Sequence, residues 1–142
     1  MSWYAALVLV LAGSLLAAPG RLQDSSVEER FLAVDVFVDS GAAPLAAWQV
    51  ELVDVSGHAR VVGVEGGEHP AFLEAPYYDP AALQSGRIIV AALHVGADLP
   101  VGRTRVARVH LVTDAEPSLA VVPMAAATVG GESIDVRAEL ER

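Results

Sequence analysis

Acidic and imidazole side chains gather in one glycine-rich stretch, residues 65–70, which runs Glu-Gly-Gly-Glu-His-Pro. Carboxylate oxygens and imidazole nitrogens are ligands of divalent cations, and the two glycines would let the backbone curl around an ion. Glu65, Glu68 and His69 are therefore candidate metal ligands, with Asp79 as a further one. Their spacing matches neither a calcium loop nor paired histidines on a helix. The competing interpretation is an acidic loop that is merely solvated.

Three aromatic side chains follow in the same part of the chain. Tyr77 and Tyr78 are adjacent and flanked by prolines, and Phe72 lies a little upstream. Flat rings with a polar tip suit the faces of sugars or the centre of a protein interface. Phe72, Tyr77, Tyr78 and Asp79 are thus candidate ligand-binding or partner-binding residues. In the competing interpretation, at least one tyrosine closes an open end of the fold and bonds its hydroxyl to backbone.

No local motif for nucleophilic catalysis is present. Ser40 and Ser56 lie in ordinary turns rather than on a sharp strand-to-helix elbow. His58, His94 and His110 fall in separate segments, so we expect strand residues or partly buried histidines rather than ligands. A triad or a carboxylate pair built from distant residues leaves no signature in one sequence. We therefore expect a non-catalytic protein without a cofactor.

The overall composition excludes several functional classes. The 142 residues carry a formal net charge of −9, whereas nucleic-acid binding requires a basic surface. The chain has no cysteine, which rules out disulfides and thiol chemistry. Arg103, Arg105 and Arg108 form the one local cationic cluster. On a regular strand the first two would share a face and Arg108 would lie opposite, which favours an ion-paired surface over an anion site.

The N-terminal part reads as an export or anchor segment. Residues 3–18 are uncharged and apolar, and the run is shorter than the roughly 20 residues of a comfortable membrane crossing. Ala17 and Ala18 resemble the small residues before a signal cleavage site, but a proline follows them and no basic residue precedes the run. We expect a hydrophobic helix in residues 1–20, either a signal peptide or a retained anchor, then a linker at 21–30. A buried N-terminal helix of the domain is the third interpretation.

From Phe31 onward the apolar residues recur every second position, which indicates β-strands. The predicted strands cover residues 31–38, 45–55, 59–64, 87–95, 104–113, 118–129 and 133–140. Residues 65–84 lack this period, and a helical turn is expected at 80–83 with Asp79 as its cap. Gly130-Gly131 predicts a hairpin turn. Residues 31–142 are therefore expected to form one all-β antiparallel sandwich domain.

The alternation also predicts which side chains face inward. Trp48, Val50 and Leu52 fall on one side of their strand, and Ala107, Val109 and Leu111 fall on one side of theirs, with Arg108 and His110 outward. The nearly unbroken apolar run at 87–95 is typical of a central strand, and Pro123 marks an edge or a bulge.

The strand order resembles that of the cohesin-like family, jelly-roll sandwiches related to carbohydrate-binding modules. The likeness is carried by residues 34–57, 86–93 and 100–113 and covers most of residues 30–140. It implies a secreted or surface-attached module that binds a partner protein, in the best-known case a dockerin. The Asp-Pro pair at Asp79 lies inside the long loop, whereas the comparable pair in cohesins follows the second strand more closely. The resemblance therefore implies the fold rather than the dockerin-binding surface.

Taken together, the sequence predicts an exported, non-catalytic protein-interaction module of the periplasm, cell surface or extracellular space. The contact would be made by the 65–84 loop or by a sheet face. A carbohydrate-binding module that uses Tyr77 and Tyr78 on a polysaccharide is the first alternative. A structural subunit of a surface assembly is the second, with an edge strand that accepts a strand from the next copy. Contact with a membrane is expected only through residues 3–18 if they are retained.

Overall fold

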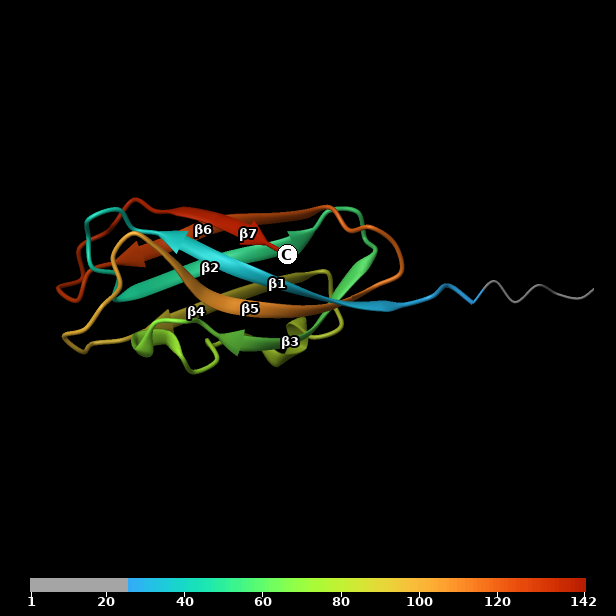
Figure 1. Ribbon diagram of the computed structural model, residues 1–142, viewed down its shortest axis with the longest axis horizontal. Helices are drawn as coiled ribbons and strands as arrows, with labels where there is room; N and C mark the ends of the chain where they lie inside the picture. The colour runs from blue at the N-terminus through green and yellow to red at the C-terminus, as the bar shows by residue number, and fades with distance from the viewer. Residues whose placement is uncertain (1–25) are drawn as a thin grey trace, which may run out of the picture.

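The structure is a computed structural model that describes residues 26–142 (Figure 1). The predicted signal or anchor at residues 1–20 and the first half of the predicted linker lie outside the described residues. In the described part, no helix has both the length and the apolar character needed to cross a membrane.

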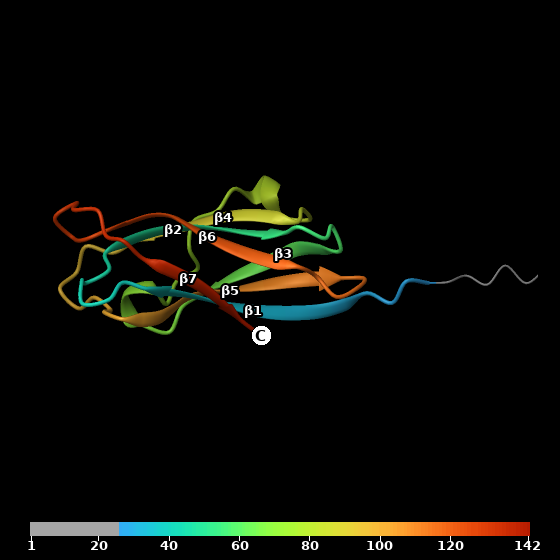
Figure 2. The same cartoon turned by 90° about the horizontal axis from the view of Figure 1, so that it is seen from above.

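The described chain folds into two antiparallel sheets packed as separate layers (Figure 2). Its strands are β1 (Arg30–Asp39), β2 (Ala47–Asp54), β3 (Ala59–Gly66), β4 (Arg87–Leu93), β5 (Arg103–Thr113), β6 (Leu119–Ala127) and β7 (Arg137–Glu141). One sheet has the order β3-β5-β1-β7, and the other has the order β4-β2-β6. Two short 3-10 turns, η1 (Pro70–Phe72) and η2 (Pro80–Ala82), interrupt the long loop between β3 and β4. The predicted all-β architecture is confirmed.

The core lies between the two sheets and is built from the predicted inward rows. Val34, Val36 and Val38 of β1 have no exposed surface, and Val50 and Leu52 of β2 are equally buried on the facing sheet. Successive side chains of a strand point to opposite faces, so a period of two places every second apolar residue inside. Burying each such side chain stabilises the fold by about 1.5–3 kcal/mol.

Strand β4 differs from its prediction because it lies at an edge rather than at the centre of its sheet. Ile88 and Val90 point into the core, whereas Ile89, Ala91 and Leu93 point to the outer face. The sequence run is nearly continuously apolar because both faces of this strand are apolar, one in the core and one at the surface. An apolar run alone cannot separate these two cases.

A β-bulge in β5 changes which face its arginines occupy. Val106 and Ala107 are consecutive and both buried, and β1 has no residue opposite Val106. One extra residue shifts the alternation of a strand by one position. Arg105 and Arg108 therefore lie on the same outer face, and the prediction that Arg108 lies opposite was wrong.

Strand β6 ends in the predicted turn, but the chain then crosses to the other sheet. Pro123 lies at a register shift of this edge strand, as its type predicted. Gly131 has φ +83°, which a glycine adopts without strain, and it closes the turn after β6. Beyond an isolated bridge at Ser133, regular pairing starts at Arg137, where β7 joins β1. The predicted last strand therefore begins several residues late.

The buried carboxylate of Asp54 ties the end of β2 to two neighbouring segments. It accepts hydrogen bonds from the backbone N–H groups of Ser56, His58, Ala59 and Ser118 at 2.7–3.0 Å, and from the Ser56 hydroxyl at 2.6 Å. Burial raises the pKa of Asp54, but these hydrogen bonds outweigh it and hold that pKa far below its ordinary value of 3.8. The ionised carboxylate thus joins the β2–β3 turn to the segment before β6.

We expect Asp54→Asn to lower the free energy of unfolding at neutral pH by about 2 kcal/mol, because an NH2 group replaces an acceptor oxygen facing backbone N–H groups. Wild-type stability should fall as the pH drops below 3.8, since Asp54 then binds a proton in the unfolded chain but stays ionised in the folded chain. The variant should lose that part of the acid dependence. Urea unfolding across the acid range measures both effects, with exposed Asp135→Asn as the matched control. Equal stability, or parallel acid profiles, would contradict this role of Asp54.

Candidate functional site

The outer face of the β3-β5-β1-β7 sheet carries paired charges, together with the exposed ring of Phe31 and the Phe37 ring, over which the Arg103 guanidinium lies at 3.6 Å. Arg108 donates to the Asp35 carboxylate at 2.6 Å, and Arg105 lies 3.9 Å from the same group. The hydrogen bond from Arg108 lowers the pKa of Asp35. Arg103 pairs with Glu139 at 2.9 Å across the strands. This is the ion-paired surface expected of the arginine cluster, and such a face is satisfied in water.

The outer face of the β4-β2-β6 sheet has the opposite character. Apart from Gln49, its uncharged side chains are small or apolar, and among residues 26–142 its strands place two charged side chains on this face, Glu51 and Arg87, which form an ion pair with each other. Register places Ala91, Gln49 and Ala125 in one row across the three strands. The other outward apolar positions are Ala47, Val53, Ile89, Leu93, Ala120, Val122, Met124 and Ala127.

A shallow cavity of about 400 Å³ is hollowed into this face, and we call it the alanine trough. Its floor is formed by Ala47, Ala91, Ala125 and Ala127, and its sides include Gln49, Leu93 and Tyr77. Methyl groups stand lower than their longer neighbours, so a row of alanines leaves room above the sheet. The trough is therefore an exposed apolar surface with a defined shape.

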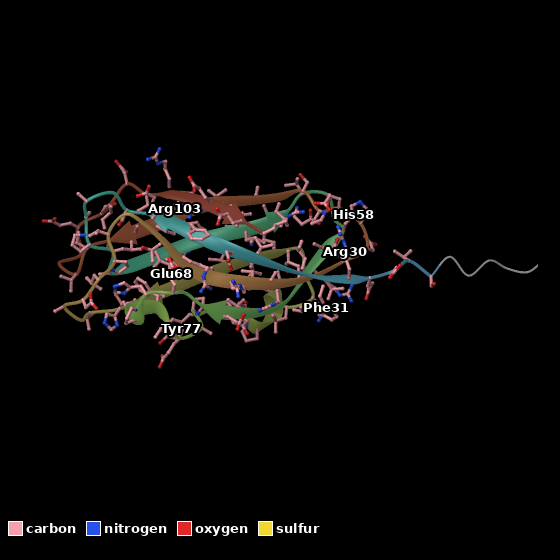
Figure 3. The ribbon with its side chains drawn as sticks, viewed as in Figure 1. Arg30, Phe31, His58, Glu68, Tyr77 and Arg103 are labelled. Atoms are coloured by element: carbon pink, nitrogen blue, oxygen red, sulfur yellow. The ribbon has the colours of Figure 1, made fainter. Side chains whose placement is uncertain are left out.

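Tyr77 stands at the rim of the alanine trough because the long loop adds one bridge to the edge of β4. Its N–H donates to the Ala91 carbonyl at 2.8 Å, and the Ala91 N–H donates back at 3.0 Å. Residues opposite each other in an antiparallel pair share a face, so the Tyr77 ring lies on the outer side with Ala91. The ring is 80% exposed, and it projects from the edge of the molecule (Figure 3).

The two tyrosines do not form one platform. Tyr78 is half-buried and packs against the core, on the opposite side of the backbone from Tyr77. Tyr78 packs as the competing interpretation expects, but among the described residues its hydroxyl makes no hydrogen bond to backbone. Asp79 caps η2 as predicted, accepting the Ala81 N–H at 2.9 Å, and its side chain is exposed.

Phe72 belongs to the core, contrary to the predicted binding role. It is 2% exposed and packs edge-on against the Trp48 ring, with the ring centroids 6.0 Å apart. This contact fixes the long loop on the sandwich and so helps to position Tyr77. Trp48 is a core residue, as its phase with its strand neighbours predicted.

The candidate metal ligands are held apart by different partners. Glu65 pairs with His110 at 2.6 Å, and Glu68 accepts the backbone N–H of Arg105 at 2.9 Å. His69 accepts a backbone N–H within its own turn at 3.1 Å. Within residues 26–142, no group of three histidine, cysteine or acidic side chains is placed to hold a metal ion. The geometry favours the solvated loop over the predicted metal site.

The two loop glycines serve close packing of the backbone. A Cβ on Gly66 would lie 2.0 Å from the carbonyl oxygen of Leu73, and one on Gly67 would lie 2.2 Å from that of Arg105. No side chain fits at either position without moving backbone. Gly66 therefore lets the long loop fold back on the end of β3, and Gly67 lets the chain pass close to β5, which is a different task from wrapping an ion.

The chain matches no model of a protein family, no curated protein and no solved structure. The resemblance to the cohesin-like family stays a prediction. The site is therefore defined by geometry and chemistry alone.

Sequence reasoning missed the trough residues on β4 and β6, such as Ala91 and Ala125. The signal was present in the sequence, because apolar residues occupy both the odd-numbered and the even-numbered positions of residues 87–95 and 118–129. A strand of an antiparallel sandwich needs only one apolar face, so a second one marks a surface that a solvated strand would not carry.

We expect Phe72→Ala to lower the free energy of unfolding by about 3 kcal/mol, because it leaves a cavity against Trp48. Tyr77→Ala should change it by no more than about 0.5 kcal/mol, since the exposed ring adds little to folding and the bridge uses backbone atoms. Urea unfolding followed by tryptophan fluorescence compares the two variants. A large loss in Tyr77→Ala would show that its ring serves the fold.

Proposed function

We propose that the chain is an exported, non-catalytic protein-interaction module whose contact surface is the alanine trough with Tyr77 at its rim. The observation that carries the proposal is the contrast between the two outer faces: one carries ion pairs beside the rings of Phe31 and Phe37, whereas the other is apolar apart from Gln49 and the Glu51–Arg87 pair. Contiguous exposed apolar surface marks an interaction site in soluble domains. Exposed aromatic rings beside such a surface are typical of the residues that dominate binding energy.

The chemistry of the trough limits the kind of partner it fits. Glu51 and Arg87 neutralise each other, so this face offers no net charge to attract an acidic or a basic partner. A floor of methyl groups leaves room for one or two apolar side chains from outside. The expected partner is therefore a protein that presents a branched or aromatic side chain on an uncharged surface.

Export and the absence of catalysis are part of the same proposal. The uncharged run at residues 3–18 supports export, as does the resemblance to surface-attached modules. The trough offers a methyl-lined floor rather than a nucleophile beside a base, which supports binding over chemistry. A structural subunit that binds its own kind through this face is the competing function.

The test places an arginine on each outer face in turn. Ala125→Arg puts a charge into the trough, and Ala33→Arg puts one among the ion pairs of the other sheet, where Ala33 is also exposed. Both variants and the wild type are used to capture proteins from the cell envelope, with quantitative mass spectrometry. We expect one partner that is recovered with the wild type and Ala33→Arg, and at least tenfold less with Ala125→Arg, because burying an unpaired charge is unfavourable.

The partner is then purified and its affinity for the three chains measured by calorimetry. Equal affinity for Ala125→Arg and the wild type would overturn the assignment of the trough. Recovery of the chain's own copies alone, with self-association lost in Ala125→Arg, would favour the structural-subunit function instead.

A further inference from the structure

A second, larger cavity of about 620 Å³ adjoins the alanine trough, and it shares Tyr77, Gln49 and Ala91 with it. It lies between η2 and the outer face of β4. Unlike the trough, it is lined by many polar side chains, which are Gln49, Tyr77, Tyr78, Asp79, Ser85 and Arg87. Its volume falls within the range of small-ligand sites, which is about 300–1,000 Å³.

Some of the polar groups in this cavity have bonding capacity to spare, although the Ser85 hydroxyl already bonds to backbone and Arg87 is paired with Glu51. Asp79 uses Oδ1 to cap η2, which leaves its other carboxylate oxygen to accept from a ligand. Gln49 donates to the sulfur of Met124 at 3.6 Å, a weak partner that a better acceptor would replace. Tyr77 adds a phenolic hydroxyl that can donate and accept. The cavity thus mixes donors and acceptors in a small volume.

The ring of Tyr77 has no evident task in the fold. Only its backbone bridges to Ala91, and many residue types could supply that bridge. An 80% exposed ring keeps its apolar face in water, where it gains little. An exposed flat ring that lines a cavity of mixed polar and apolar character is suited to stack on a ligand that is itself flat and partly apolar.

The charges of the cavity favour a neutral ligand. Arg87 is its cation, and Arg87 is already paired with Glu51. The Asp79 carboxylate would repel a phosphate or a uronic acid. A purely apolar side chain would leave the cavity's polar groups without partners.

We propose that this cavity is a subsite for a neutral oligosaccharide. One face of a sugar ring stacks on Tyr77, while its hydroxyls bond to the carboxylate of Asp79 and the amide of Gln49. The chemical class is set by the combination of one aromatic face with several uncharged hydrogen-bonding positions. This site goes beyond the protein-interaction function and does not depend on it.

The test titrates the full, ¹⁵N-labelled chain with neutral hexasaccharides of glucose, mannose, xylose and N-acetylglucosamine, followed by amide chemical shifts. Any detergent used must lack a sugar headgroup. We expect at least one of these sugars to shift amides of β4 and residues 77–85. A hexamer of galacturonic acid is the charged comparison and should bind at least tenfold more weakly.

Three variants assign the binding. Tyr77→Ala should weaken it at least tenfold by removing the stacking ring, and Asp79→Asn should weaken it several-fold while its amide oxygen keeps the cap of η2. Ala33→Arg, on the other sheet, should bind as the wild type does. No shift with any neutral sugar at 10 mM, or equal binding by Tyr77→Ala, would overturn the subsite. The titration contains no partner protein, so its result does not depend on the result of the capture experiment.

Discussion

Two sheets pressed face to face can bury only one face of each, and this constraint organises the whole molecule. The inner faces must be apolar, and the rows through Val34–Val38 and Val50–Leu52 meet that requirement with almost no exposed surface. The outer faces are then free to differ. One has become a lattice of arginine and acidic side chains, which water and ion pairing satisfy. The other has kept apolar side chains that folding does not need, and an excess of this kind is typical of an interaction surface.

The core also places the features of the second face. Phe72 anchors the long loop against Trp48, and from that anchor the chain reaches the edge of β4 in an extended form. Extended backbone sends consecutive side chains to opposite sides, so Tyr78 turns inward and Tyr77 outward. One loop therefore contributes to the core and to the surface at once. Asp54 gives the opposite end of the sandwich a polar anchor of comparable importance.

Much of the fold follows from the alternation of residue types, and its failures have physical causes. Rows such as Val34–Val38 predicted both strand and orientation, because regular pairing preserves the period of two. The bulge at Val106 broke that period, and a bulge depends on pairing with β1 that local sequence does not reveal. Phe72 and Tyr77 look alike as loop aromatics, and only the tertiary contact with Trp48 separates buried from exposed. Asp54 was missed because its partner Ser118 is distant in the chain, although Asp-Val-Ser is a recognisable turn pattern.

The tight seating of Gly66 and Gly67 has a consequence for how this chain can diversify. Both positions are closed to every other amino acid by neighbouring carbonyl groups, whereas Glu65 and Glu68 beside them touch mainly surface partners. Lineages of this domain should therefore hold the glycine pair constant while the stretch after it drifts in sequence. A protein engineer could replace that stretch with other sequences, provided that the glycine pair and Phe72 are kept to hold it on the sandwich.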